Sequence, residues 1–288
     1  MTGARVAIAG AALGAIALTG AVGCSKSSGV AADAGTAAID AAPMVPAVRA
    51  LDAAVTAMPR PPLAPCRELA ASGKITASHE ADGGTASIAR NDVVDAWIDL
   101  DAAARVTVKE PRTGRELLFI GAATVVPCVQ ESEAWLMRGE FQSARGSGEK
   151  PGAEQWIVTP FAVVRYGAAV VDVVVDAEST RAALKAGGAS VIADGGDSWH
   201  ALDPAVPLVA KGMGPDDGTD ASDRCAVKSA DAKTLEDQLL APGETRDPGF
   251  GDLARRTTEA RVLARAVCAM KALRVAMRTS TSPTPPPP

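Results

Sequence analysis

Short runs of β-branched residues, separated by glycine, aspartate and proline, fill the chain between Cys66 and Lys211. In Arg105–Lys109 valines alternate with polar side chains, which is the period-two pattern of a strand with one buried face. Similar candidate strands lie at 115–120, 123–126, 134–137, 155–159, 162–165, 169–176, 181–185 and 189–193. Many short strands at close spacing predict a mainly β domain, built as a sandwich, a barrel or a solenoid.

A helical pattern replaces the strand pattern from Asp220 onward. The spacing predicts one helix over 222–240, ended by Pro242 and Gly243, and a second helix that runs to about Arg278. Asp247 is a suitable N-cap for the second helix and Pro248 a suitable first residue. Because the connection is short, we expect the two helices to form an antiparallel α-helical hairpin.

Aromatic residues indicate where the main core lies. Eight of the nine lie between Trp97 and Trp199, and large rings dominate the energetics of cores. We therefore expect the main core in this window.

The formal net charge of −5 does not suggest nucleic acid as a partner.

The start of the chain is typical of an export signal. Arg5 precedes an apolar stretch over 6–22, which is too short and too rich in alanine to predict a spanning helix. The residues Ala21-Val22-Gly23-Cys24 resemble the lipobox of bacterial lipoproteins, in which the cysteine thiol receives a diacylglyceryl group and the signal is cut just before it. The alternative is an ordinary signal peptide with an incidental cysteine. By the same resemblance, Ser25 after Cys24 implies an outer-membrane location facing the periplasm, in an organism that has an outer membrane.

Five cysteines are an odd number for an exported protein. With Cys24 assigned to lipid, the other four can form two disulfides in an oxidising compartment. In the expected hairpin Cys225 and Cys268 lie at nearly the same height, so we predict that they pair and leave Cys66 to pair with Cys128. The alternative is that some of these cysteines stay reduced in the core.

These patterns divide the chain into five parts. Residues 1–23 are the expected signal peptide, and 24–65 are the lipidated cysteine and an Ala/Gly/Pro-rich disordered tether. Residues 66–211 form the β-rich domain, 220–279 the helical hairpin, and 280–288 a proline-rich disordered tail.

A family resemblance rests on the segment 156–169, in which a valine-threonine-proline strand leads to a strand containing Gly167. This segment looks like the FecR-type domain, and so do its continuation over 170–176, Thr180-Arg181 and 186–191. Upstream, 104–108 and 136–141 fit the spacing of the family, and the resemblance covers roughly 93–194. Phe161 stands where the family usually has glycine after Thr-Pro. The resemblance implies an all-β periplasmic domain of stacked short strands without enzymatic activity.

The best-known members of this family sense a loaded outer-membrane receptor and regulate a sigma factor across the inner membrane. Such TonB-linked signalling needs a cytoplasmic segment before a membrane span, and only five residues precede the apolar stretch here. We therefore expect a binding or scaffold module, held at the membrane by its lipid anchor, with an unidentified envelope protein or glycan as partner. A regulator or sensor in envelope signalling is the alternative.

Residues that could carry chemistry are few. His79 and His200 have no metal-ligand spacing, and no catalytic motif is present, so we expect no enzyme, cofactor or metal site. Asp216, Asp217, Asp220 and Asp223 do not match a calcium loop and are expected to favour the start of the first helix. The basic second helix could contact anionic lipid headgroups or peptidoglycan. The alternative is that its arginines pair with the acidic segment before it.

Overall fold

The computed structural model describes residues 64, 66–78, 85–86, 93–94, 97–144, 150, 152–211, 219–241 and 249–281. The expected signal peptide, Cys24 and all of the tether except Ala64 lie outside these residues. So do His79, Asp216, Asp217, Asp247 and Pro248. None of the helices in the described ranges is long and apolar enough to cross a membrane.

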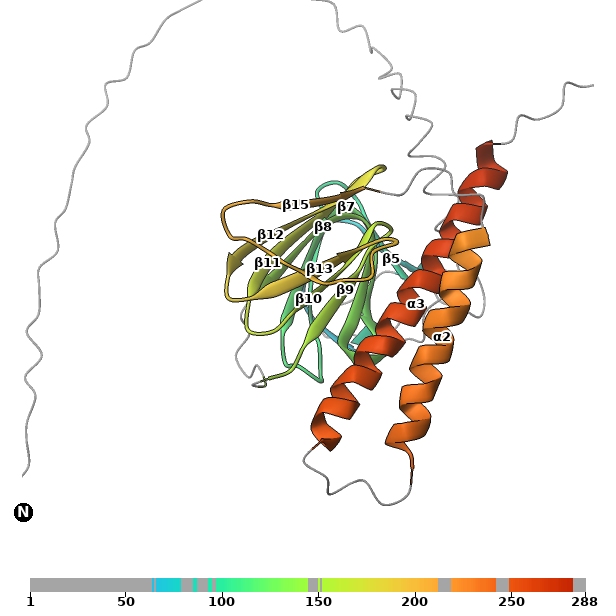
Figure 1. Ribbon diagram of the computed structural model, residues 1–288. Helices are drawn as coiled ribbons and strands as arrows, with labels where there is room; N and C mark the ends of the chain where they lie inside the picture. Colours follow the sequence, from blue (N-terminus) through green and yellow to red (C-terminus); the bar gives the residue numbers. More distant parts are fainter. Residues whose placement is uncertain are drawn as a thin grey trace, which may run out of the picture. The chain divides into compact units, whose positions relative to one another are not determined.

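The described chain consists of strands followed by two helices (Figure 1). Fifteen strands belong to one hydrogen-bonded sheet. They are β1 (Cys66–Ser72), β2 (Ile75–Ser78), β3 (Thr85–Ala86), β4 (Val93–Val94), β5 (Trp97–Leu100), β6 (Arg105–Lys109), β7 (Glu116–Val129), β8 (Glu133–Ala144), β9 (Gln155–Val158), β10 (Ala162–Tyr166), β11 (Val170–Val175), β12 (Ser179–Ala186), β13 (Ala189–Ala193), β14 (His200–Ala201) and β15 (Leu208–Lys211). The helices are α2 (Thr219–Leu239) and α3 (Phe250–Thr281). The predicted mainly β fold followed by a helical hairpin is confirmed.

The long hairpin of β7 and β8 divides the sheet into two layers. The first half of β7 pairs with β6 and the second half with β5, while β8 pairs with β9 at its start and with β11 near its end. One layer therefore has the strand order β14-β13-β10-β9-β8-β7-β5-β2-β3, and we call it the helix-covered layer. The other has the order β15-β12-β11-β8-β7-β6-β1-β4, and we call it the open layer. The arrangement is sandwich-like and antiparallel, except that β8 and β9 are parallel.

The main core lies between the two layers. Leu117 and Phe119 of β7 face it from the open layer, and Val125 of the same strand faces it from the helix-covered layer. The rings of Phe119 and Phe141 lie 5.4 Å apart, and those of Phe141 and Tyr166 lie 6.3 Å apart. The core thus lies in the aromatic window that the sequence predicts.

Two glycines allow the β7–β8 hairpin to bend from one layer into the other. The register between the strands shifts between Ile120 and Thr124. A Cβ on Gly121 would lie 1.8 Å from the carbonyl oxygen of Asp101, and one on Gly139 would lie 2.4 Å from the Cβ of Ala123. The sequence suggested separate strands at 115–120 and 123–126, and this was wrong because the glycine between them continues the strand through a bend.

We predict that Gly139→Ala lowers the free energy of unfolding by about 2–4 kcal/mol, because Gly139 has a φ of +100° and its Cβ would meet the Ala123 backbone and side chain. Gly152→Ala is the matched control, since its φ is +75° and nothing lies within 4 Å of its Cβ. It should cost only about 1 kcal/mol, from backbone strain alone. Urea unfolding with the disulfides intact measures both, and equal losses would contradict the role of the bend.

The two helices run antiparallel and side by side (Figure 1). They begin and end close to the expected positions. However, α3 continues to Thr281 and so includes the first two residues of the expected tail. The helix extends this far because the first helix-breaking residue is Pro283. The rest of the tail lies outside the described residues.

Both disulfides have the pairing expected from the sequence. Cys66 is bonded to Cys128, with Cα atoms 5.9 Å apart, and Cys225 is bonded to Cys268, with Cα atoms 4.8 Å apart. The first joins β1 of the open layer to β7, and the second joins α2 to α3. Sequence separations of 62 and 43 residues imply about 4 kcal/mol of stabilisation each in the chain-entropy model.

Candidate functional site

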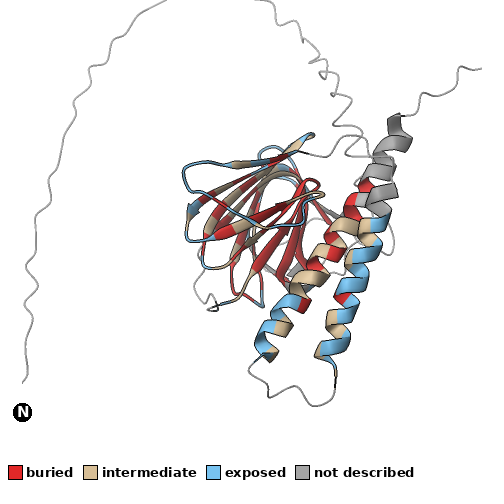
Figure 2. Cartoon of the chain, in the orientation of Figure 1, coloured by how far each residue is buried: buried red, intermediate tan, exposed pale blue. Residues whose placement is uncertain are grey.

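The outer face of the helix-covered layer is apolar and carries three tryptophans, Trp97, Trp135 and Trp156. Helix α3 covers it mainly with small or flexible side chains. These are Val262, Ala266, Ala269, Met270 and Leu273. All four residues of β9 are buried, because one side faces the main core and the other faces the helix (Figure 2). Such two-sided burial explains why these strands are continuous apolar runs in the sequence.

Helix α3 fits closely against this face. A cavity of about 30 Å³, lined by residues that include Val163, Ile192 and Met270, lies between the helices and the sheet. That volume has room for about one or two waters. Little space is therefore left between the side chains that line this cavity.

Glu133 anchors one point of the interface. It lies at the start of β8, its side chain is completely buried, and one carboxylate oxygen pairs with the guanidinium of Arg265 on α3. Its other oxygen accepts a hydrogen bond of 3.1 Å from the indole Nε1 of Trp135. A buried carboxylate needs such partners, since desolvation without them is costly. Docking of α3 supplies the positive charge.

Arg165 anchors a second point. Its guanidinium lies 4.5 Å from the centroid of the Trp199 ring and 5.7 Å from that of Trp156. It also donates a 2.8 Å hydrogen bond to Oε2 of Glu259 on α3. The Nε1 of Trp199 donates to Oε1 of Glu259 at 2.7 Å. Stacking on two rings and a charged hydrogen bond hold the arginine side chain in one position.

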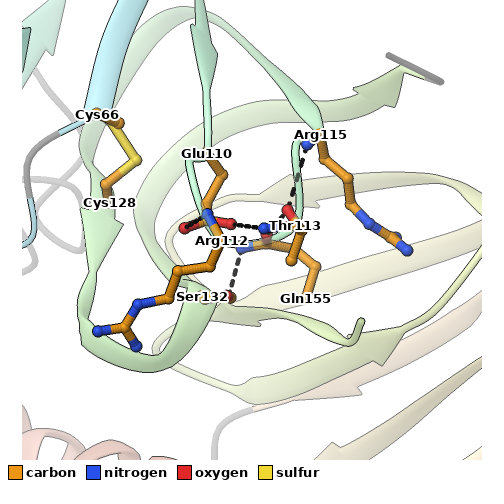
Figure 3. The surroundings of a disulfide bond; sticks show 8 residues. All are labelled: Cys66, Glu110, Arg112, Thr113, Arg115, Cys128, Ser132 and Gln155. Carbon is orange, nitrogen blue, oxygen red and sulfur yellow. Dashed lines mark hydrogen bonds between the residues drawn. A yellow bond between two sulfur atoms is a disulfide. The ribbon is translucent and has the colours of Figure 1, made fainter. Parts of the chain in front are cut away.

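A separate polar network fixes the end of the sandwich near the β6–β7 turn (Figure 3). The carboxylate of Glu110 accepts hydrogen bonds from the backbone N–H groups of Arg112 and Thr113, at 3.0 and 2.5 Å. The amide of Gln155 donates to the carbonyl of Ser132 at 2.5 Å. These partners satisfy buried polar groups, so the network stabilises two turns and the start of β9.

The structure separates most of the residues that the sequence singled out. His200 is exposed on β14, and Asp223 is exposed on α2. No group of three or more histidine, cysteine or acidic side chains in the described ranges could hold a metal ion. Arg261 of α3 pairs with Glu236 of α2 at 2.5 Å, in agreement with the alternative that arginines of the second helix pair with the acidic segment before it. Arg265, in contrast, pairs with Glu133 of the sheet.

Four residues of the two anchors were not expected from the sequence to have such a role: Glu133, Arg165, Trp199 and Glu259. Arg165 offered one signal, because it interrupts the apolar run Ala162–Tyr166. A charged residue within a strand that is otherwise buried requires a partner. Nothing local indicates that this partner is 94 residues further along the chain.

No protein-family model matches the chain, and no curated protein matches it at a significant level.

We predict that Glu133→Gln lowers the free energy of unfolding by about 2–3 kcal/mol, because it leaves the Arg265 charge partly buried without its carboxylate. A double-mutant cycle with Arg265→Gln should give a coupling energy above about 1 kcal/mol. Asp252→Asn is the control, since it breaks an exposed pair with Arg255 and should cost less than about 0.5 kcal/mol. Additive effects of Glu133→Gln and Arg265→Gln in urea unfolding would contradict the anchoring role.

Proposed function

We propose that the chain is a non-enzymatic lipoprotein of a bacterial envelope, whose β domain acts as a FecR-like binding or scaffold module. The observation that carries the proposal is the pairing of the cysteines. Four of the five form two disulfides, and Cys24, the remaining one, stands at the end of the lipobox-like sequence. Disulfides persist in oxidising compartments, so the pairing supports export. A diacylglyceryl group on Cys24 would then hold the domain at the membrane.

Two turns in the part of the chain that carries the resemblance support the FecR-like part of the proposal. Thr159 and Pro160 form the turn between β9 and β10, and Gly187 lies in the turn between β12 and β13. The hydroxyl of Thr159 accepts a hydrogen bond from the backbone N–H of Ala162 at 2.9 Å and lies 2.7 Å from the hydroxyl of Thr180. The Thr159 hydroxyl thus stabilises the turn through hydrogen bonds inside it. These bonds are a physical reason for a threonine in the valine-threonine-proline pattern.

The outer face of the open layer is the surface that we assign to a partner. The cross-strand registers place six residues in one row across it: Val209, Arg181, Val174, Glu140, Ile120 and Arg105. Each is exposed or half-buried, so apolar and charged side chains alternate at the surface. Arginine is enriched at protein interfaces, and a partner that covers the valines and the isoleucine removes their apolar surface from water. This row therefore supports an envelope protein as the partner.

The lipid anchor is tested by metabolic labelling with palmitate. The wild-type chain should incorporate label and Cys24→Ser should not, because the thiol of Cys24 is the proposed attachment site. The double variant Cys225→Ser/Cys268→Ser is the matched control and should keep its label. Equal labelling of wild type and Cys24→Ser would exclude this anchor.

The partner surface is tested by photo-crosslinking in intact envelopes. A photoreactive residue in place of Arg181 should give a discrete adduct, because Arg181 is exposed in the middle of the row. The same residue in place of Val227, which is 56% exposed on α2, is the control and should give none. Val174→Glu should weaken the Arg181 adduct by burying a charge in the interface. Equal adducts from both positions would refute the assignment.

A further inference from the structure

The two disulfides differ in how far a reagent in solution can reach them. Cys66 is 3% exposed and Cys128 is 1% exposed, so the bond between them is closed to solvent. Cys225 and Cys268 are both half-buried, and their bond joins two helices that lie side by side outside the sheet (Figure 1). Thiol–disulfide exchange requires a thiolate to reach a sulfur atom. In the folded protein, a thiol can therefore attack the Cys225–Cys268 bond far more easily than the Cys66–Cys128 bond.

The two sulfur atoms of the Cys225–Cys268 bond have different surroundings. Ser229, one helical turn after Cys225 on α2, is exposed. On α3, Ala264 and Ala269 lie on either side of Cys268 in the sequence, and both are buried. An attacking thiolate thus reaches the sulfur of Cys225 more readily than that of Cys268.

A hydroxyl group lies beside the sulfur that would leave. Oγ of Ser229 is 3.6 Å from Sγ of Cys268. When the bond opens by attack on Cys225, its electron pair stays on Cys268 as a thiolate. The hydroxyl of Ser229 can then donate a hydrogen bond to that thiolate, and a stabilised thiolate is a better leaving group.

Helix α2 has few other contacts that would keep it in place. It is exposed over much of its length (Figure 2), and Ala232 is the only buried side chain among those that the structure describes in it. In its ion pair with α3, the side chains of Glu236 and Arg261 are 40% and 33% exposed. Its ion pair with the loop before β14, Lys228–Asp197, spans 3.8 Å. Exposed ion pairs contribute little stability, so the disulfide is the main restraint on α2.

Helix α3, in contrast, has contacts that do not depend on the disulfide. Its apolar side chains pack on the tryptophan face, and Glu259 and Arg265 form the two polar anchors to the sheet. Opening the disulfide therefore frees α2 and leaves α3 docked. It also uncovers the side of α3 that faces α2, where Thr257 is 1% exposed and its hydroxyl lies 3.4 Å from the carbonyl of Leu235.

We propose that the Cys225–Cys268 disulfide is a site of thiol–disulfide exchange, at which a protein dithiol opens the helical hairpin and releases α2. The first thiolate of the dithiol attacks Sγ of Cys225 and forms a mixed disulfide, and Cys268 leaves with the electron pair. The second thiolate attacks the dithiol's own sulfur in the mixed disulfide, and Cys225 leaves in turn. The dithiol ends as a disulfide, and its two electrons and two protons end on Cys225 and Cys268 as two thiols.

This exchange site lies on the helical hairpin and not on the open layer. The proposal therefore goes beyond the scaffold role, and it depends neither on the partner surface nor on the lipid anchor.

The first test compares the two disulfides in the full-length chain with Cys24→Ser, in which these four are the only cysteines. The folded protein is incubated with dithiothreitol, free thiols are blocked with N-ethylmaleimide at successive times, and the blocked cysteines are identified by peptide mass spectrometry. Cys225 and Cys268 should become blocked at least about tenfold faster than Cys66 and Cys128. Equal rates, or faster opening of the Cys66–Cys128 bond, would overturn the proposal.

The second test identifies which sulfur is attacked. A thioredoxin whose second active-site cysteine is replaced by serine cannot complete the exchange, so it should be trapped in a mixed disulfide with Cys225. Ser229→Ala should slow reduction by dithiothreitol at least about twofold, because the leaving thiolate of Cys268 loses its donor. Thr234→Ala, which removes another exposed hydroxyl of α2, is the matched control and should leave the rate unchanged. An adduct on Cys268, no adduct, or an unchanged rate in Ser229→Ala would contradict the assigned attack.

The third test measures the release of α2 by hydrogen exchange. Reduction should increase exchange over residues 223–239 of α2 at least about tenfold, while residues 262–273 of α3 stay protected. Cys225→Ser/Cys268→Ser should show the same pattern without a reductant. Adding dithiothreitol to this variant is the control and should change nothing further, since the Cys66–Cys128 bond stays closed. Unchanged exchange in α2, or equal loss of protection in both helices, would refute the selective release of α2.

Discussion

The helix-covered layer is buried on both of its faces, and much of the remaining structure depends on this constraint. Successive side chains of a strand point to opposite sides, so a strand that is apolar throughout needs two covers. The open layer covers one side, and α3 covers the side that carries Trp97, Trp135 and Trp156. The alanines of α3 let the helix backbone approach these large rings closely. The hairpin is therefore an integral part of the core and not an appendage to the sheet.

Apolar contact alone would not specify how α3 lies on the sheet, because the hydrophobic effect has no direction. The two polar anchors provide that direction. Glu259 and Arg265 are six residues apart on α3, or about 9 Å along its axis, and they reach β10 and β8 respectively. A helix that slid or rotated would lose both pairs and leave Glu133 buried without its charge partner. The anchors thus fix the rotation of α3 and its position along the sheet, which apolar contact with the tryptophans does not determine.

The strands, the helical hairpin and its disulfide could be predicted from the sequence, whereas the contacts that join α3 to the sheet could not. The alternation in Arg105–Lys109 identifies β6 because a strand with one buried face has a clear period. The apolar runs of β9 and β10 predict strands, but a continuous run does not show what covers the second face. Cys225 and Cys268 could be paired because a helical hairpin fixes the relative height of its residues. The contacts of Arg165 with Trp199 and Glu259 form only when α3 docks on the sheet. No local sequence pattern predicts that docking.

The placement of the disulfides explains how a helix as polar as α2 can belong to this fold. Of the α2 side chains that the structure describes, Ala232 is buried and most others are exposed, so α2 has little apolar surface with which to dock on its own. The Cys225–Cys268 bond and the Glu236–Arg261 pair attach it to α3 instead. Within the described residues, the Cys66–Cys128 bond joins two strands of the sheet, and the Cys225–Cys268 bond joins the two helices. No disulfide among these residues links the sheet to the hairpin, and the packing of α3 on the sheet is non-covalent. The Cys225–Cys268 bond restricts the motion of the two helices relative to each other before α3 docks on the sheet. Docking therefore has to immobilise one linked pair of helices and not two separate helices.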